Sequence, residues 1–303
     1  MIGTLSLVRE LHPWFFPGIA FALGACIGSF LNVVIYRVPA GKSIVYPGST
    51  CGCGQPIAWY DNLPILSWLI LRGHARCCGR PFSVRYPFVE LLTAGLFLAA
   101  WLKMPPAVAV CGWVFLGSLV CATFIDLDHM IIPDAFTIGL AIEGLLLSGL
   151  VPALHGQHSG YYVVDSLRSA SASLVGIIAG SGIVLWIALI AEALLKKEAM
   201  GFGDVKFVGA IGAFCGWHGA IFSVFGGAAV GTVWIGIALA WQKLAGKPAA
   251  AAPRAETPEG APADIGLGVH VPFGPMLAVA GGLYFLCLRG WVDAWFEQLT
   301  SLL

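Results

Sequence analysis

Residues 107–134 read AVAVCGWVFLGSLVCATFIDLDHMIIPD, and this stretch decides the class of fold. Its first 19 residues carry no charge, close to the apolar length that a helix needs to cross a bilayer. Three carboxylates, Asp126, Asp128 and Asp134, follow directly. Ionisable groups at membrane depth usually mark function. The stretch therefore predicts a membrane helix that ends in a candidate site.

The whole chain has the composition of a membrane protein. Of its 303 residues, 58% are hydrophobic and 11% are charged, against roughly 45–50% and about 25% in soluble domains. The mean hydropathy is +0.87. The 16 basic residues balance the 16 acidic ones, so the chain has no excess of positive charge that would attract nucleic acid. We expect a multi-pass protein in contact with membrane lipid and no nucleic-acid partner.

Apolar stretches predict an all-α polytopic membrane protein with about eight transmembrane helices. Seven stretches are clear, at 15–36, 87–101, 107–125, 135–154, 170–195, 220–241 and 271–288. The eighth, 205–217, is short and rich in glycine. Eight crossings place twelve Lys and Arg residues on one side and four on the other. This imbalance puts the first group in the cytoplasm and both termini outside it.

Polar segments divide the chain into three predicted parts. Residues 1–36 form the first membrane helix, and 37–86 form a small cysteine-containing cytoplasmic insert before the second helix. Residues 87–303 form the main membrane domain. Within it, 246–264 has the Ala, Pro and Glu composition of a disordered linker. Gly24 and Gly28, spaced as Gly-x-x-x-Gly, indicate a helix-packing surface in the first helix.

A second boundary carboxylate, Asp204, lies in MGFGDVK at 200–206. Gly201 and Gly203 allow backbone conformations and close approaches that other residues prevent. Two neighbouring carboxylates share a proton. One can then deprotonate water while the other polarises a carbonyl group, which is the chemistry of amide hydrolysis.

Three other interpretations stay open. Asp134, which follows Pro133, can be a helix-capping residue. Paired membrane carboxylates also form proton or cation sites in transporters, although transport sites usually lie at the midplane of repeated halves, and no repeat is visible here. A non-catalytic scaffold for secretion-system assembly is the third interpretation, and it leaves the two aspartates unexplained.

Four cysteines gather in the insert, at Cys51, Cys53, Cys77 and Cys78. Four thiolates can hold a structural zinc ion and fix a loop that is too short to build a large core. Free or redox-active thiols are the alternative. A permanent disulfide is not expected in a reducing cytoplasm.

The sequence resembles the type 4 prepilin peptidases, which are intramembrane aspartic proteases of the Gly-x-Gly-Asp class. The stretches that carry the resemblance are GSFLNVVIYRVP at 28–39, NLPILSWLILRG at 62–73, RYPFVELL at 85–92, IDLDHMIIPD at 125–134, GFGDVK at 201–206 and PFGP at 272–275. The resemblance implies that Asp126 and Asp204 are catalytic. It also implies that Pro133, Gly201, Gly203 and Lys206 support the active-site motifs. The family's usual pair of Cys-x-x-Cys motifs is altered here.

The resemblance also implies a function. Members of the family cut the leader from type 4 prepilins and pseudopilins, the subunits of type IV pili and type II secretion systems. They act in the bacterial inner membrane, with the active site facing the cytoplasm. Members with the long insert then methylate the new N-terminus with S-adenosylmethionine. The insert contains no glycine-rich nucleotide motif, so the residues that bind this cofactor are unknown from the sequence.

Overall fold

The computed structural model describes residues 11–196, 200–244 and 272–301. Regular structure in these ranges is helical, apart from two isolated β-bridges in the insert. The chain divides into two compact units, Met1–Ile125 and Asp126–Leu303. The all-α prediction is confirmed, whereas the predicted linker at 246–264 falls outside the described residues.

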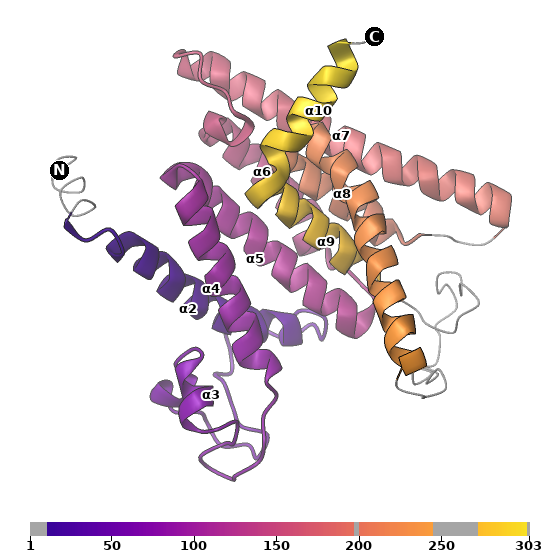
Figure 1. Cartoon of the computed structure of the whole chain (residues 1–303). Helices are drawn as coiled ribbons and strands as arrows, with labels where there is room; N and C mark the ends of the chain where they lie inside the picture. The colour runs from indigo at the N-terminus through magenta and orange to yellow at the C-terminus, as the bar shows by residue number, and fades with distance from the viewer. Residues whose placement is uncertain (1–10, 197–199, 245–271, 302–303) are drawn as a thin grey trace. The chain divides into compact units, whose positions relative to one another are not determined.

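Unit 1 contains two membrane helices that pack against each other (Figure 1). It also contains most of a third helix. These are α2 (Phe15–Arg37), α4 (Arg85–Lys103) and most of α5 (Pro106–His129). The insert between α2 and α4 holds two short elements, η1 (Trp59–Asn62) and α3 (Leu66–Ile70). The predicted order, with a small insert between the first two membrane helices, is therefore present.

Glycines bring α2 and α4 into backbone contact. A Cβ on Gly24 would lie 2.7 Å from the Cα of Ala94, and a Cβ on Gly28 would lie 2.7 Å from the Cα of Glu90. Real Cβ atoms do not approach backbone atoms this closely. The Gly-x-x-x-Gly spacing is thus a helix-packing surface, as the sequence predicted, and it places the first turns of α4 against α2.

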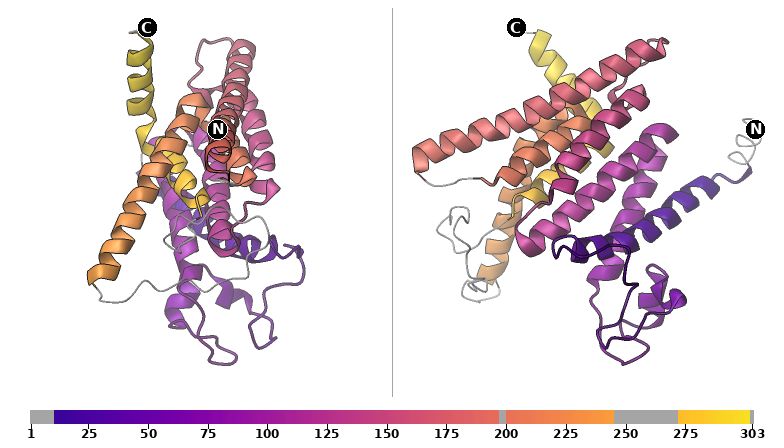
Figure 2. Two further views of the ribbon diagram at one scale, coloured as in Figure 1. Left: turned by 90° about the vertical axis from the view of Figure 1, so that its right-hand side faces the viewer. Right: turned by 180° about the vertical axis from the view of Figure 1, so that it is seen from behind.

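Unit 2 begins with the last turn of α5 and continues through a bundle of helices. In chain order these are η2 (Asp134–Phe136), α6 (Ile138–Leu150), η3 (Pro152–His155), α7 (Tyr162–Leu195), α8 (Phe202–Leu244), α9 (Gly274–Leu283), η4 (Tyr284–Leu288) and α10 (Arg289–Ser301). Helix α8 packs against α7 and α9, and α9 lies beside α8 in both figures (Figure 1, Figure 2).

Helix α8 folds back on itself at Gly216. A Cβ on Gly180 of α7 would lie 2.8 Å from the carbonyl oxygen of Val208 and 3.1 Å from the Cβ of Ala220. Twelve residues of straight helix span about 18 Å, so both can adjoin Gly180 only if the chain reverses between them. Gly216 makes the reversal with φ 69° and ψ −177°, a conformation that glycine adopts readily. Residues 202–215 and 217–244 are called the first and second arms.

This reversal accounts for the short eighth span predicted at 205–217. Six described helices are long and apolar enough to cross a membrane, and α8 counts once among them. The two arms of α8 together with the shorter α6 bring the number of membrane helices to about eight. The chain is an integral membrane protein.

Candidate functional site

Asp126 lies at the start of unit 2, near the C-terminal end of α5. It is only 6% exposed. Its Oδ2 accepts a hydrogen bond of 3.1 Å from the backbone amide of Gly274, the first residue of α9. A Cβ on Gly274 would lie 2.5 Å from this same oxygen. Glycine is therefore the residue that lets the α9 backbone reach the carboxyl group.

Asp204 stands in the first turn of α8, and its amide donates a hydrogen bond of 3.1 Å to the carbonyl oxygen of Gly201. Its carboxyl group is close enough to that of Asp126 for the two to interact electrostatically. The structure thus brings together the two carboxylates from sequence positions 78 residues apart. Such a pair can share a proton and work as an acid and a base.

The two glycines before Asp204 are not required by contacts within the chain. The nearest atom to a Cβ on either Gly201 or Gly203 lies 3.9 Å away, and neither residue has a positive φ. A Cβ at either position would make ordinary van der Waals contact with the described residues, so packing does not explain the two glycines, and their use by a substrate chain stays a prediction.

Lys206 joins the two aspartate motifs. Its Nζ donates to the Oδ1 of Asp134 at 2.7 Å, and the side chains are 28% and 66% exposed. Pro133 precedes η2 with an extended ψ of 147° and makes no side-chain cap. Asp134, interpreted from sequence as a solvated or capping residue, is solvated and paired with Lys206.

The four cysteines of the insert form one cluster. Their Sγ atoms all lie within 4.8 Å of one another, with Cys51 and Cys78 at 3.6 Å and Cys53 and Cys77 at 3.4 Å. Each pair sits on a tight turn, and Gly54 and Gly79 follow these turns with positive φ values of 90° and 66°. The thiols of one turn therefore lie next to the thiols of the other turn.

This cluster fits a tetrahedral metal site. Zinc–sulfur bonds of about 2.3 Å place the sulfurs of a tetrahedron about 3.8 Å apart, close to the spacing of these thiols. All four cysteines are free of disulfides. A hydrogen bond from the Cys53 amide, with further ones from the neighbouring thiols, lowers the pKa of Cys51 to about 7, while hydrogen bonds to the Cys51 and Cys53 thiols raise the pKa of Cys77 to about 12. A lowered pKa favours the thiolate, the form that binds metal.

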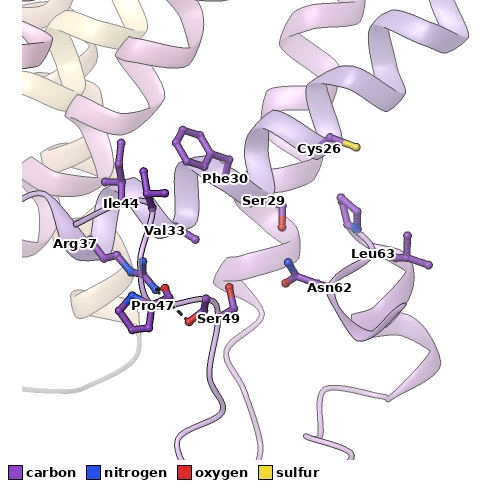
Figure 3. Close-up of a pocket in the computed structure, with 13 residues that line it drawn as sticks. Cys26, Ser29, Phe30, Val33, Arg37, Ile44, Pro47, Ser49, Asn62 and Leu63 are labelled. Atoms are coloured by element: carbon purple, nitrogen blue, oxygen red, sulfur yellow. Dashed lines mark hydrogen bonds between the residues drawn. The ribbon is translucent and has the colours of Figure 1, made fainter. Parts of the chain in front are cut away.

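Two cavities adjoin each other beside the C-terminal half of α2. The smaller has a volume of about 430 Å³ and the larger about 730 Å³. Both are lined by Ser29, Arg37 and Asn62. In Figure 3, Arg37 turns toward the chain at Pro47, whose carbonyl oxygen accepts a hydrogen bond of 2.7 Å from it. Glu90 lines the larger cavity.

Sequence reasoning missed two of these residues. Gly274 belongs to the PFGP stretch, but nothing in that stretch indicates a contact with Asp126, because the partners are 148 residues apart. Glu90 belongs to RYPFVELL, in which a single acidic residue near a helix start looks like an ordinary surface charge. The sequence signal that could have pointed to Glu90 is the Gly-x-x-x-Gly spacing of the first helix, since Gly28 packs on the backbone of Glu90.

The described residues thus form a helical membrane protein in which two carboxyl groups from separate helices interact. The profile of the Type IV leader peptidase family matches residues 113–236, which hold both aspartates. The profile of the Bacterial Peptidase A24 N-terminal domain matches residues 22–104, which hold the cysteine cluster and both cavities. The chain belongs to the type IV leader peptidase family and is an enzyme.

Individual relatives agree with the family assignment. Three proteins named prepilin leader peptidase/N-methyltransferase are similar to this chain. The Klebsiella pneumoniae protein is 37% identical over 72% of this chain and 94% of its own length. The Aeromonas hydrophila protein is 34% identical over 93% and 95%, and that of Pectobacterium carotovorum is 34% identical over 95% and 99%. No solved structure matches the chain significantly.

Proposed function

We propose that this enzyme removes the leader from type 4 prepilins and pseudopilins, with Asp126 and Asp204 as its catalytic pair. The observation that carries the proposal is the electrostatic interaction of these two carboxyl groups in unit 2. Relatives that align with this chain over nearly their whole length are named prepilin leader peptidase/N-methyltransferase. A transporter would explain the carboxylate pair but not these relatives, and a non-catalytic scaffold would explain neither.

The two carboxyl groups suffice for amide hydrolysis without a covalent intermediate. The ionised carboxylate takes a proton from water while the protonated partner donates a hydrogen bond to the scissile carbonyl oxygen. The water oxygen bonds to the carbonyl carbon, and the resulting tetrahedral carbon then releases the amine, which leaves with a proton. The amide of Gly274 holds the Asp126 carboxyl group in one orientation during these steps.

The other groups of the site have supporting roles in this proposal. Lys206 pairs with Asp134 and joins the two aspartate motifs, while Pro133 sets the extended backbone before η2. Gly201 and Gly203, which carry no side chain, let the substrate backbone approach the chain beside Asp204. We place the active site at the cytoplasmic face of the bacterial inner membrane, because the twelve-to-four division of Lys and Arg puts both motifs on that side.

The insert and unit 1 have a second set of roles. We assign one structural zinc ion to Cys51, Cys53, Cys77 and Cys78, whose spacing suits it. We also assign to the chain the methylation of the newly exposed N-terminus, with S-adenosylmethionine as methyl donor, because the relatives are named as N-methyltransferases. In this proposal, residues 37–86 form the insert and residues 87–303 form the peptidase domain.

Cleavage of a prepilin embedded in membranes tests the catalytic pair. Asp126→Asn and Asp204→Asn nearly preserve side-chain volume but remove the shared proton, so each should abolish cleavage while leaving expression unchanged. Asp128→Asn, two residues further along the same motif, should retain activity. Normal cleavage by either dyad variant at matched protein levels would disprove the assignment. Loss only in Asp128→Asn would move the catalytic role to that residue.

A further inference from the structure

The larger cavity of unit 1 has the size and location of a separate small-molecule site. Its volume of about 730 Å³ lies inside the range of roughly 300–1,000 Å³ found for ligand pockets. Its walls are the C-terminal half of α2, the insert and the first turns of α4. All of these belong to unit 1, whereas Asp126 and Asp204 belong to unit 2. The peptidase proposal therefore leaves this cavity unused.

Glu90 gives the cavity a buried carboxyl group. The residue is 8% exposed, and its Oε2 accepts a hydrogen bond of 2.7 Å from the amide of Ile65. The hydroxyl of Ser29 is a second hydrogen-bond partner. Both partners are neutral, so neither balances a negative charge. A buried carboxylate is costly without a compensating partner, and a cationic ligand would supply one.

The backbone is strained at Ile65, the residue whose amide donates a hydrogen bond to Glu90. Ile65 has a φ of 63°, a region that β-branched residues rarely enter. Such conformations persist where the surrounding structure requires them, and they gather at ligand-binding sites. Here the strained residue is the one whose amide donates to Glu90, so the strain is located at the carboxyl group that faces the cavity.

Aromatic rings complete the wall. Tyr36, Tyr60 and Tyr86 line the cavity and are each about half exposed or more. Lys42 lies over one face of the Tyr36 ring and Arg76 over one face of the Tyr60 ring, so a ligand would contact the opposite faces of these two rings. Aromatic faces attract cations and stack on nucleic-acid bases. Asp61 lines the cavity as well, but Arg76 holds its carboxylate through hydrogen bonds of 2.8–3.0 Å. Its charge is therefore already balanced, unlike that of Glu90.

We infer that this cavity binds S-adenosylmethionine, with Glu90 facing the positive charge of the donor and the tyrosine rings contacting its base and sulfonium. The donor combines a purine with a sulfonium, an ammonium and a carboxylate group. This combination matches a wall that offers aromatic rings, the carboxyl group of Glu90 and the guanidinium of Arg37, which donates to backbone carbonyl oxygens. The inference rests on the proposed methyl transfer and adds to it the location of the donor.

The reaction assigned to this region is a simple displacement. The neutral N-terminal amine of the cleaved substrate attacks the methyl carbon, so a carbon–nitrogen bond forms. The carbon–sulfur bond breaks and its electron pair moves to sulfur, which leaves S-adenosylhomocysteine. The methylated ammonium then releases a proton to water. No oxidant or reductant is needed.

Direct binding tests the inference. Purified full-length protein in lipid nanodiscs is titrated with S-adenosylmethionine by calorimetry, without any prepilin. Glu90→Gln, which keeps an acceptor for the Ile65 amide, and Tyr86→Ala should each weaken binding by about tenfold or more, roughly 1.4 kcal/mol. Tyr86→Phe retains the ring and should bind within about twofold of the wild type. Glu143→Gln, an exposed glutamate of α6 in unit 2, should bind like the wild type.

Three outcomes would overturn the inference. Wild-type affinity in both Glu90→Gln and Tyr86→Ala would place the donor elsewhere. Loss of binding to a synthetic pilin N-terminal peptide in Glu90→Gln, with donor affinity intact, would assign the cavity to the peptide. A wild-type protein that neither binds the donor nor methylates a cleaved pilin would remove the methyl-transfer function and this inference together. Prepilin cleavage by the same preparations reports separately on the peptidase proposal.

Discussion

Gly274 is a residue at which one added methyl group should strongly reduce the proposed activity. Gly274→Ala would place a methyl group 2.5 Å from the Asp126 carboxyl oxygen and 2.9 Å from Ile132, so the carboxyl group must move. Displacements of about 1 Å in an active site can reduce rates on the order of a hundredfold. We therefore expect prepilin cleavage to fall by about that factor while the protein stays folded.

A glycine in the neighbouring helix provides the matched control. Gly290 lies in α10, and a Cβ added to it would have no atom within 4 Å, so Gly290→Ala should cleave at the wild-type rate. Equal rates for the two alanine variants would mean that the α9 backbone does not position Asp126. A Gly274→Ala protein that aggregates or fails to insert would show a structural defect instead, which a thermal melt of both variants detects.

For the cysteines, the sequence predicts which residues form the site but not how their side chains are arranged. Four thiols in one short segment predict a metal site, but adjacent Cys77 and Cys78 depart from the usual ligand spacing. Only the fold shows that two facing turns bring the Sγ atoms within 4.8 Å. Asp126 and Asp204 were likewise identifiable from their unusual position at membrane boundaries. The electrostatic interaction between them, and the hydrogen bond of Asp126 with Gly274, depend on helices that are distant in the sequence.

We predict one zinc ion per chain, bound by these four cysteines. Elemental analysis of purified protein should find it, and Cys53→Ser with Cys78→Ser should lose it, because a serine hydroxyl is a poor zinc ligand beside thiolates. Cys26→Ser changes a cysteine of α2 outside the cluster and should keep the metal. A wild-type enzyme that is active without any metal would make the cluster incidental.

At the scale of elements, glycine decides where helices touch. Gly24→Ala should destabilise unit 1, because the new methyl would meet the backbone of Ala94 at 2.7 Å and overpacking typically costs about 1–3 kcal/mol. Gly18 lies in the same helix, α2, with nothing within 4 Å. Gly18→Ala should therefore be neutral or slightly stabilising, since alanine has the higher helix propensity.

Thermal unfolding of the two variants in the same detergent measures the difference. A lower midpoint for Gly24→Ala than for Gly18→Ala is the expected result. Equal midpoints would mean that α2 and α4 can separate without loss. The same comparison separates packing from propensity, because both substitutions add one methyl group to one helix.

Helix boundaries were predicted well where apolar runs are long, and less well where they are interrupted. The predicted spans 15–36 and 87–101 lie within a residue or two of α2 and α4. Helix α7 begins at Tyr162, eight residues before the predicted 170, because polar residues such as Arg168 lie on a continuous helix that extends beyond its apolar part. The reversal at Gly216 was not predictable, since one glycine among many carries no local sign of a turn.

For the whole molecule, we predict eight crossings with both termini outside the cytoplasm, from the distribution of Lys and Arg. Termini on the same side of the membrane require an even number of crossings. Because α8 folds back on itself, its two arms count as two crossings and make the total even. Reporter fusions after Trp241 and at the C-terminus should therefore report opposite sides of the membrane. Reporters on the same side would remove the last crossing and place the C-terminus in the cytoplasm.

The lengths of two helices in unit 2 have a consequence for the lipid around them. The first arm of α8 has 14 residues and α6 has 13, so each is only about 20 Å long, against a hydrocarbon core of about 30 Å. They pack on each other, since Gly144 of α6 adjoins Ala213 and Phe214. Residues 207–215 of the first arm are buried in the bundle, whereas α6 exposes Ile142, Leu146 and Leu150. Acyl chains beside α6 must therefore compress, or headgroups must descend to meet its ends. A bilayer thinned beside α6 would shorten the distance between the aqueous phase and the helix that packs on the Asp204 arm.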